Sequence, residues 1–452
     1  MYLMNVIKFG GSSLASGEQL KKVLQIIIDD PNRKIVVVSA PGKRSSADEK
    51  VTDLLINLGI AALKGQEIEK EMAKVLSRYR LIAEELELDS VTIEEIKANL
   101  LALVNGDKVN PDYYLDTFKA SGEDNNAKLI AAYFNKEGLP ARYVNPREAG
   151  LYVTDEPGNA QILAESYKNL YQLRKIKEII IFPGFFGYTK SGKICTFSRG
   201  GSDITGAILA NGVQASLYEN FTDVDAIYVA NPSVVMNPCA IKELTYREMR
   251  ELSYAGFSVL HDEALFPAFK EGIPVQIKNT NNPKAPGTSI LKKRQLSDQE
   301  VVGIASSTGF CSIYIEKYLM NREIGFGRRV LEILEDQNLS YEHMPSGIDD
   351  LTIILRENQL SEKGQHLLIN RLKNELSADS VVVEGNLALI MIVGEGMRQN
   401  SGTMSKAATA LTRNHINIEM VNQGASEVSF MFGISANQEE QAIKALYHAF
   451  FE

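Results

Sequence analysis

The sequence predicts an α/β fold in which a mostly parallel sheet is sandwiched by helices and followed by two small α+β modules. From residue 3 to about residue 295, short β-branched segments alternate with amphipathic helical segments, the pattern of a sheet covered by helices. A turn-forming and then charged segment near 281–300 resembles a linker. Two units with the same order of elements follow it, which indicates a duplicated module.

The first part of the chain supplies the sheet. Its expected strands lie at 3–9, 34–40, 178–184, 193–197, 215–221 and 274–279. Helices are expected at 18–28, 124–136, 159–175 and 204–211, where apolar residues recur every three or four positions. Residues 46–105 show this spacing almost throughout and predict a group of helices beside the sheet.

The C-terminal part repeats one arrangement twice. The first unit has expected strands at 301–306, 311–316, 340–344 and 351–355, and helices at 325–337 and 361–375. The second has expected strands at 380–384, 387–393, 416–420 and 427–433, and helices at 402–414 and 437–450. We therefore expect a first domain at 1–296 and modules at 297–377 and 378–452. The strands near 301–312 are candidates to complete the last module.

Composition excludes several classes of protein. The chain has 452 residues, of which 44% are hydrophobic and 23% are charged, as in a soluble protein of more than one domain. The formal net charge is −9 and no basic tract is present, so nucleic acid is not an expected partner. No apolar run reaches the ~20 residues that span a bilayer, and no signal-peptide pattern opens the chain. A cytoplasmic protein that does not bind membranes is expected.

The cysteines predict neither a disulfide framework nor a metal site. There are three of them, Cys195, Cys239 and Cys311, and they lie far apart. A sparse and odd set does not match the paired spacing of disulfide or zinc sites. No metal-ligating residues are predicted.

A first anion site is indicated by "NVIKFGGSSL" at 5–14. Lys8 lies near the end of a strand, and Gly10, Gly11, Ser12 and Ser13 follow. Adjacent glycines after a strand allow several backbone N–H groups to converge on an anion, and the lysine adds positive charge. A tight turn with a surface lysine is the alternative.

A second anion site is indicated by "TFSRGGSDITGAILA" at 196–210. Arg199 precedes Gly200 and Gly201, and Ser202 and Asp203 open an apolar helix. A guanidinium group can hold an oxyanion through two hydrogen bonds, whereas Asp203 alone could be a helix cap. Because carboxyl ends of parallel strands meet at one edge, the two corners predict a site for two anionic substrates.

Three common nucleotide-binding patterns are excluded. The segment "GYTKSGK" at 187–193 has the glycine and lysine spacing of a P-loop, but Ile194 follows where Ser or Thr is needed. It lies between two strands, so a hairpin turn is expected. No G-x-G-x-x-G opens a helix, and no H-R-D or D-F-G motif is present. Dehydrogenases of the Rossmann type and protein kinases are therefore disfavoured.

The chain resembles the aspartokinase family over nearly its whole length. The resemblance rests on "KFGGSS" (8–13), "SGED" (121–124), "SRGGSD" (198–203), "FTDVDAIYVANP" (221–232) and the duplicated tail, which is similar to two ACT domains. It implies the amino-acid kinase fold and phosphorylation of the L-aspartate side-chain carboxylate by ATP with Mg²⁺. The product would be 4-phospho-L-aspartate, the first step towards lysine, threonine and methionine. A carboxylate is ionised at pH 7, so no general base is required.

The resemblance also implies roles for particular residues. Lys8 and Asp203 are the expected catalytic residues, with Asp203 ordering the lysine. The residues expected to bind aspartate are Ser39, Glu123, Arg199, Gly201 and Ser202. Glu123 would pair with the α-ammonium group, and Arg199 would clamp a carboxylate. The residues expected to bind ATP are Lys8, Gly10, Gly11, Ser12, Thr222, Asp223, Tyr228 and Lys278. For Lys278, a solvated lysine is the alternative, and His261, which matches a family histidine, is expected only to pack.

The chain departs from the family pattern at a few positions. Ser12 stands where threonine is usual, and Ser198 and Ala226 stand where glycines are common. Asn231 and Ser233 replace an aspartate and an arginine, which removes two charges from the expected phosphate contacts.

The tail is expected to bind an amino-acid effector. In the family, ACT modules pair across chains, which implies a homodimer or homotetramer. The residues expected to bind the effector are Met320, Gly325, Phe326, Ser346, Gly347 and Asp349. Lysine is favoured because Asp349 and Asp350 could meet its ammonium group, although a solvated acidic turn is the alternative.

Two other functions are compatible with the sequence. One is another amino-acid kinase, such as a glutamate kinase, against which "SGED" and the duplicated tail argue. The other is an amino-acid sensor without catalysis, against which intact Lys8, Arg199 and Asp203 argue.

Overall fold

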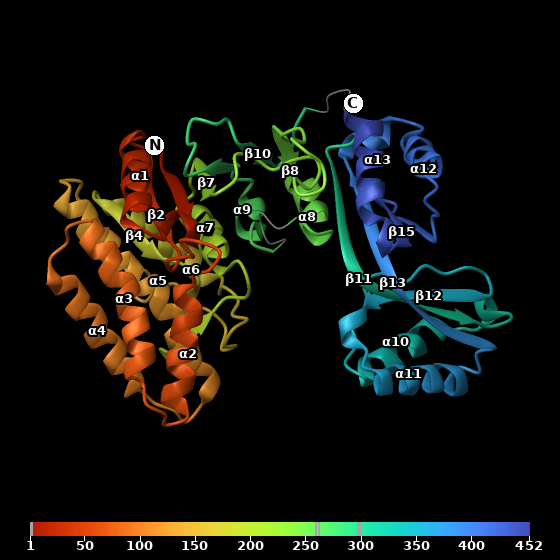
Figure 1. Ribbon diagram of the computed structural model, residues 1–452, viewed down its shortest axis with the longest axis horizontal. Coiled ribbons are helices and arrows are strands. Elements are labelled where there is room, and N and C mark those ends of the chain that lie inside the picture. The colour runs from red at the N-terminus through yellow and green to blue at the C-terminus, as the bar shows by residue number, and fades with distance from the viewer. Residues whose placement is uncertain (1–2, 258–259, 261–262, 296–299) are drawn as a thin grey trace. The chain divides into compact units, whose positions relative to one another are not determined.

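The computed structural model describes residues 3–257, 260, 263–295 and 300–452 (Figure 1). The chain forms two compact units. The first comprises Met1–Ile227, Ala240–Arg250 and Ser258–Arg294, and the second comprises Tyr228–Cys239, Glu251–Phe257 and Gln295–Glu452. The expected domain boundary after residue 296 and the expected packing of His261 both lie outside the described residues.

The first unit is built on an eight-stranded sheet of order β3-β4-β2-β1-β7-β9-β10-β8. Its strands are β1 (Asn5–Phe9), β2 (Arg33–Val38), β3 (Ala141–Tyr143), β4 (Ile179–Pro183), β7 (Leu217–Thr222), β8 (Glu243–Thr245), β9 (Val275–Asn279) and β10 (Thr288–Leu291). Every neighbouring pair from β3 to β9 is parallel, and β10 runs antiparallel to β9. The predicted mostly parallel sheet is confirmed, and the carboxyl ends of its central strands share one edge.

The predicted helices correspond to α1 (Gly17–Ile28), α2 (Val51–Leu63), α3 (Glu69–Glu85), α4 (Ser90–Val104), α5 (Pro111–Lys136), α6 (Glu165–Leu170) and α7 (Gly201–Gly212). Two further helices were not predicted: α8 (Tyr246–Tyr254), whose last residues belong to the second unit, and α9 (Phe266–Glu271). The helical segment predicted at 46–105 is α2, α3 and α4, and α5 begins well before the predicted residue 124. Between β5 (Phe186–Tyr188) and β6 (Ile194–Thr196) lies the expected hairpin turn.

The two faces of the sheet have different roles. Residues paired in register share a face, so Lys8 and Asn220 lie on one face while Phe9, Phe221 and Lys278 lie on the other. Phe9 and Phe221 stack at 5.1 Å between ring centroids. They belong to a buried core with apolar residues of α1 to α5, the red to orange helices of Figure 1. Lys8 therefore lies on the sheet face opposite this core.

The second unit contains a five-stranded antiparallel sheet of order β12-β11-β13-β15-β14. Its strands are β11 (Gly303–Glu316), β12 (Asp350–Arg356), β13 (Ser380–Val393), β14 (Met420–Gln423) and β15 (Ser429–Ser435). Its helices are α10 (Phe326–Asp336), α11 (Glu362–Glu375), α12 (Thr403–Arg413) and α13 (Glu439–Phe451).

The expected pairs of short strands are wrong for β11 and β13, which are each continuous over 14 residues. Residues 303–307 pair with the second half of β13, and residues 310–316 pair with its first half and with β12. One apolar core contains Ile304 and residues of α12 and α13, and another contains Ile313 and residues of α10 and α11. Each module therefore uses one half of both long strands. The strand expected at 340–344 is reduced to a bridge between His343 and Ile354.

A buried ion pair ties β2 to β7 on the core face of the sheet. Arg33 donates from Nε and Nη2 to the two carboxylate oxygens of Glu219, at 2.7 and 2.6 Å. The side chains are 12% and 3% exposed. Removing one member of such a pair leaves a buried charge without compensation.

We expect Glu219→Gln to destabilise the first unit by about 3 kcal/mol, measured as a lower midpoint of urea unfolding. The matched control is Glu18→Gln, which breaks an exposed pair with Lys21 and should leave the midpoint unchanged. Equal midpoints for all three proteins would contradict a stabilising role for the buried pair.

Candidate active site

The two glycine corners meet through an ion pair. The Nζ atom of Lys8, near the end of β1, lies 2.6 Å from Oδ1 of Asp203, in the first turn of α7. The side chains are only 10% and 15% exposed. The structure therefore brings the predicted lysine and aspartate together at the carboxyl edge of the sheet, as the parallel order of the strands requires.

Asn220 is a member of this cluster that the sequence analysis missed. It pairs in register with Lys8 across β1 and β7, and its Nδ2 donates to Oδ1 of Asp203 at 2.7 Å. Asn220 is buried, so its amide helps to offset the cost of burying the carboxylate. The available signal was an asparagine inside a strand that is otherwise expected to be buried.

The first glycine corner is a point of close backbone contact. Gly10 N donates to the carbonyl oxygen of Phe221, and Gly42 N donates to that of Gly11. A Cβ atom on Gly11 would lie 3.0 Å from the carbonyl oxygen of Ala40 and 3.2 Å from Cα of Gly42. Only glycine lets the ends of β1 and β2 approach this closely.

The two serines of the first corner differ. Ser12 is exposed and free to face a ligand. Ser13 is buried, and its Oγ is hydrogen-bonded to Oγ1 of Thr280, just after β9, at 2.7 Å. Ser13 therefore joins two strand ends.

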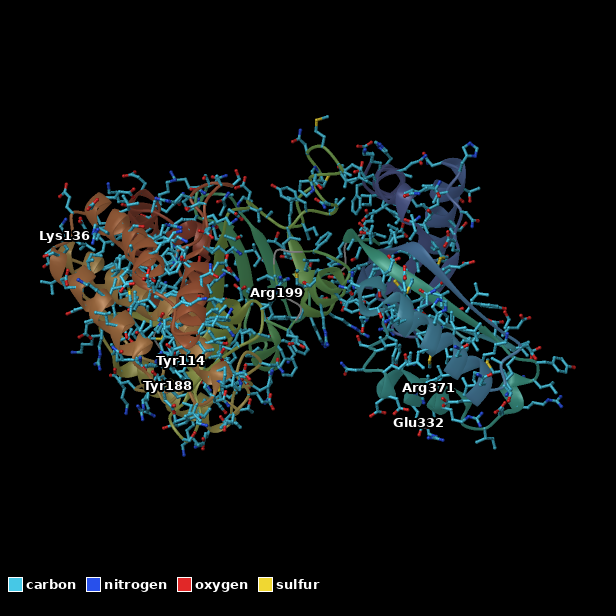
Figure 2. The ribbon with its side chains drawn as sticks, turned by 60° about the horizontal axis from the view of Figure 1, so that its bottom comes forward. Tyr114, Lys136, Tyr188, Arg199, Glu332 and Arg371 are labelled. Carbon is cyan, nitrogen blue, oxygen red and sulfur yellow. The ribbon has the colours of Figure 1, made fainter. Side chains whose placement is uncertain are left out.

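The second corner presents a cation and a helix N-terminus. Arg199 lies in the loop between β6 and α7 with its side chain exposed (Figure 2). Gly200 adopts the left-handed conformation, with φ 75°, and Gly201 begins α7. Ser202 is buried against Gly184, where a Cβ atom would meet its Oγ at 2.7 Å. The helix start and its arginine thus sit beside the end of β4.

Glu123 is a buried carboxylate that lacks a cation. It lies in α5, is 5% exposed, and has no hydrogen-bond partner for Oε2 among the residues that the structure describes. Burial raises the pKa of Glu123 to about 8, although hydrogen bonds from backbone N–H groups, that of Ala40 among them, act in the opposite direction. A positively charged ligand group would relieve this cost.

Close packing holds α5 against the end of β2. A Cβ atom on Gly122 would lie 2.8 Å from Cβ of Ala40, so a larger residue would push the helix away. The hydroxyl of Tyr79 donates to the carbonyl oxygen of Gly122 at 2.9 Å. Asn126, another residue that the sequence analysis missed, donates from Nδ2 to the carbonyl oxygen of Ser39 at 2.7 Å. Ser39 and Glu123 are therefore brought to one place.

The predicted ATP-binding residues beyond the first corner lie in different parts of the structure. Thr222 ends β7, and its Oγ1 donates to Oδ1 of the exposed Asp223 at 3.1 Å. Lys278 lies on the sheet face opposite Lys8. Burial lowers its pKa, although the nearby carboxylate of Glu219 acts in the opposite direction. The contact of Lys278 with ATP stays a prediction. Tyr228 belongs to the second unit, and its contact with a nucleotide stays a prediction.

The predicted effector segments lie side by side within the second unit. Leu319 N donates to Oδ1 of Asp349 at 2.8 Å, and Asn321 N donates to the carbonyl oxygen of Ile348 at 3.1 Å. Met320 and Phe326 are buried in the module core. Gly325, Ser346 and Gly347 are exposed.

Neither a metal-binding cluster nor a membrane-spanning helix is found in the described residues. Within the described ranges, no group of three or more His, Cys, Asp or Glu side chains could hold a metal ion. No helix in the part of the chain that is described has both the length and the apolar character to cross a membrane.

Comparison with family models matches two regions. Residues 4–279 match the amino acid kinase family, and residues 390–450 match an ACT domain. The chain is 63% identical to "Aspartokinase 3" of Bacillus subtilis (strain 168), over 99% of each protein.

Solved structures are also similar. Aspartate kinase of Clostridium acetobutylicum shares 38% identity with a TM-score of 0.87, over 99% of this chain and 100% of that one. Aspartokinase III of Escherichia coli has a TM-score of 0.78, over 99% of this chain and 100% of that one. It was solved with aspartate and ADP (R-state, 27% identity) and with lysine and aspartate (T-state, 26% identity).

The raised pKa of Glu123 predicts a pH-dependent stability. A carboxyl group whose pKa is about 8 when folded, against an ordinary 4.5, binds more protons in the folded chain. Its contribution therefore falls as pH rises from about 4.5 to about 8. Without ligand, we expect Glu123→Gln to gain stability relative to the wild type over this range, by up to about 1.4 kcal/mol per pH unit.

Urea unfolding of both proteins between pH 5 and 8.5 measures this difference. Parallel stability curves would mean that Glu123 is already ionised throughout and that its environment is not as unfavourable as described.

Proposed function

This chain belongs to the amino acid kinase family and is an aspartokinase with a C-terminal ACT domain, and we propose that it transfers the terminal phosphoryl group of ATP to the side-chain carboxylate of L-aspartate. The product would be 4-phospho-L-aspartate. The observation that carries this proposal is the buried Lys8–Asp203 pair at the edge where two glycine corners meet. Its position suits a reaction between two anions.

Positive charge and positioning account for the proposed catalysis. The attacking carboxylate is ionised at pH 7, so the barrier comes from repulsion between it and the polyphosphate. Lys8 would place an ammonium group against the phosphoryl group in transfer. Asp203 acts through the lysine, because its carboxylate holds Nζ at 2.6 Å. The lysine is thus oriented before the substrates bind.

Aspartate would bind through both of its ends. Glu123 would pair with the α-ammonium group, which supplies the cation that this buried carboxylate lacks. Arg199, which is exposed beside α7, would clamp a carboxylate, with Ser39, Gly201 and Ser202 lining the pocket. Fixing both ends would direct the side-chain carboxylate towards Lys8.

ATP would bind along the first corner. Gly10, Gly11 and Ser12 would contact its phosphates, and Thr222, Asp223 and Tyr228 its nucleoside. We propose that Mg²⁺ arrives bound to ATP, as part of the substrate. The ADP bound by the similar aspartokinase III of Escherichia coli supports a nucleotide site in this fold.

Lysine is the proposed effector of the second unit. Gly325, Ser346, Gly347 and Asp349 would bind it, with contributions from Met320 and Phe326. A crystal structure of Escherichia coli aspartokinase III contains lysine, and a curated relative is named "Lysine-sensitive aspartokinase 3". We place the enzyme in the cytoplasm, at the start of lysine, threonine and methionine synthesis, as a homodimer or homotetramer assembled through its ACT modules.

The Lys8→Ala variant tests the proposed catalytic centre. We expect its kcat to fall by about 100-fold or more, while KM for aspartate changes little, because the aspartate contacts remain. Aspartyl-phosphate formation, trapped with hydroxylamine, measures both. Lys21→Ala, which removes an exposed lysine of α1 that pairs with Glu18, is the matched control and should retain kcat. Wild-type turnover in Lys8→Ala would remove the role assigned to the lysine. If the wild type phosphorylated glutamate and not aspartate, the proposed substrate would be wrong.

The Asp349→Asn variant tests the proposed effector. We expect lysine to inhibit the wild type and the variant to need about tenfold more lysine, since one charge-assisted contact is lost. Its kcat without lysine should be unchanged. Glu332→Gln, which alters an exposed carboxylate on α10 (Figure 2), is the matched control. Inhibition by threonine and not by lysine would overturn the choice of effector.

A further inference from the structure

The proposed aspartate site contains a second buried acceptor. Oδ1 of Asn126 and Oε2 of Glu123 are both buried, and neither has a hydrogen-bond partner among the residues described. Both side chains project from α5, three residues apart, and so lie on one face of the helix. Buried polar atoms are nearly always hydrogen-bonded in folded proteins. Two unsatisfied acceptors on one helix face therefore indicate a ligand.

The orientation of the Asn126 amide follows from its other contact. Its Nδ2 donates to the carbonyl oxygen of Ser39 at 2.7 Å. A flipped amide would place Oδ1 against that carbonyl oxygen, where neither atom can donate. The free atom of this side chain is therefore the acceptor.

Asn126 and Glu123 lie against the same short segment of chain. Asn126 contacts the carbonyl group of Ser39, and the backbone N–H group of the next residue, Ala40, is close enough to lower the pKa of Glu123. Because these two residues are adjacent at the end of β2, both unsatisfied oxygens lie at one place on the sheet edge.

The chemistry of the pair selects one kind of ligand group. Two acceptors, of which one can carry a negative charge, fit a group with several donors and a positive charge. A primary ammonium group has three donors on one atom. A carboxylate or phosphate would meet only acceptors there and be repelled.

We propose that Asn126 is the second acceptor for the α-ammonium group of the substrate, alongside Glu123. Asn126 would thereby favour α-amino acids over dicarboxylates that lack this group. This inference rests on the proposed function, because it assumes that aspartate binds at this edge.

A comparison of two ligands tests the proposal. L-Aspartate carries the ammonium group, and succinate is the same dicarboxylate without it. We expect Asn126→Ala to lower kcat/KM for L-aspartate by roughly 10- to 100-fold, the effect of one hydrogen bond to a charged group. The inhibition constant of succinate, measured against aspartate, should stay unchanged.

The neighbouring Asn125 provides a matched control. It is equally buried, and its atom without a partner among the described residues is the donor Nδ2. Its Oδ1 accepts from Nδ2 of Asn99 at 2.8 Å, on the side of α4. Asn125→Ala should leave the ratio of aspartate to succinate affinity at its wild-type value. Asn126→Ser, a milder change that also removes the amide oxygen, should show the same selective loss and serves if Asn126→Ala does not fold.

The outcomes separate the two proposals. Equal weakening of aspartate and succinate would show that Asn126 only holds Ser39 in place, and would overturn the inference. Unchanged kcat/KM for aspartate in both Asn126 variants would overturn it as well. Failure of the wild type to phosphorylate aspartate would instead remove the proposed function, whatever the variants do.

Discussion

The ion pair between Lys8 and Asp203 is the interaction on which the arrangement of the active edge depends. A lysine near the end of a buried strand is costly unless its charge is compensated. Asp203 compensates it from the first turn of α7, and Asn220 shares the same carboxylate oxygen from the neighbouring strand. The pair therefore links β1, β7 and α7, and it holds the ammonium group in a mostly buried place before any substrate is present. Such preorganised charge is what a reaction between two anions requires.

The same edge carries features that a stable fold would avoid. Among the residues that the structure describes, the buried carboxylate of Glu123 has no cation and the buried Oδ1 of Asn126 has no donor. Side-chain bulk is missing where Gly11 meets the end of β2 and where Gly122 meets Ala40. These features lie at the carboxyl ends of the central strands, whereas the paired Arg33 and Glu219 lie farther back along the strands, with Arg33 at the start of β2. In most folded proteins, packing and hydrogen bonding are satisfied nearly everywhere except at the functional site. A concentration of unfavourable groups at one place is therefore typical of such a site.

The second unit has a different physical basis. Its two modules share the strands β11 and β13, which run without interruption from one apolar core to the other. If the pairing of one strand shifted by a single residue, its buried and exposed side chains would exchange faces. The register of one module is therefore tied to that of the other through the shared strands, with irregular pairing confined to residues 307–312.

Local patterns in the sequence were enough to predict the parallel sheet, the helices beside it, the two glycine corners and the resemblance to aspartokinases. These features depend on hydrophobic period, on glycine and on charged residues close in sequence. Only the tertiary structure decided which face each side chain occupies and what surrounds it. The register of Lys278 with Phe221, for example, places it on the core face of the sheet, which its sequence neighbours do not reveal. Asn126 carried no local signal, and Asn220 only that of a polar residue inside a buried strand, because their partners Ser39 and Asp203 are distant in sequence. The pKa of Glu123 likewise follows from burial, which many residues far apart in the chain create together.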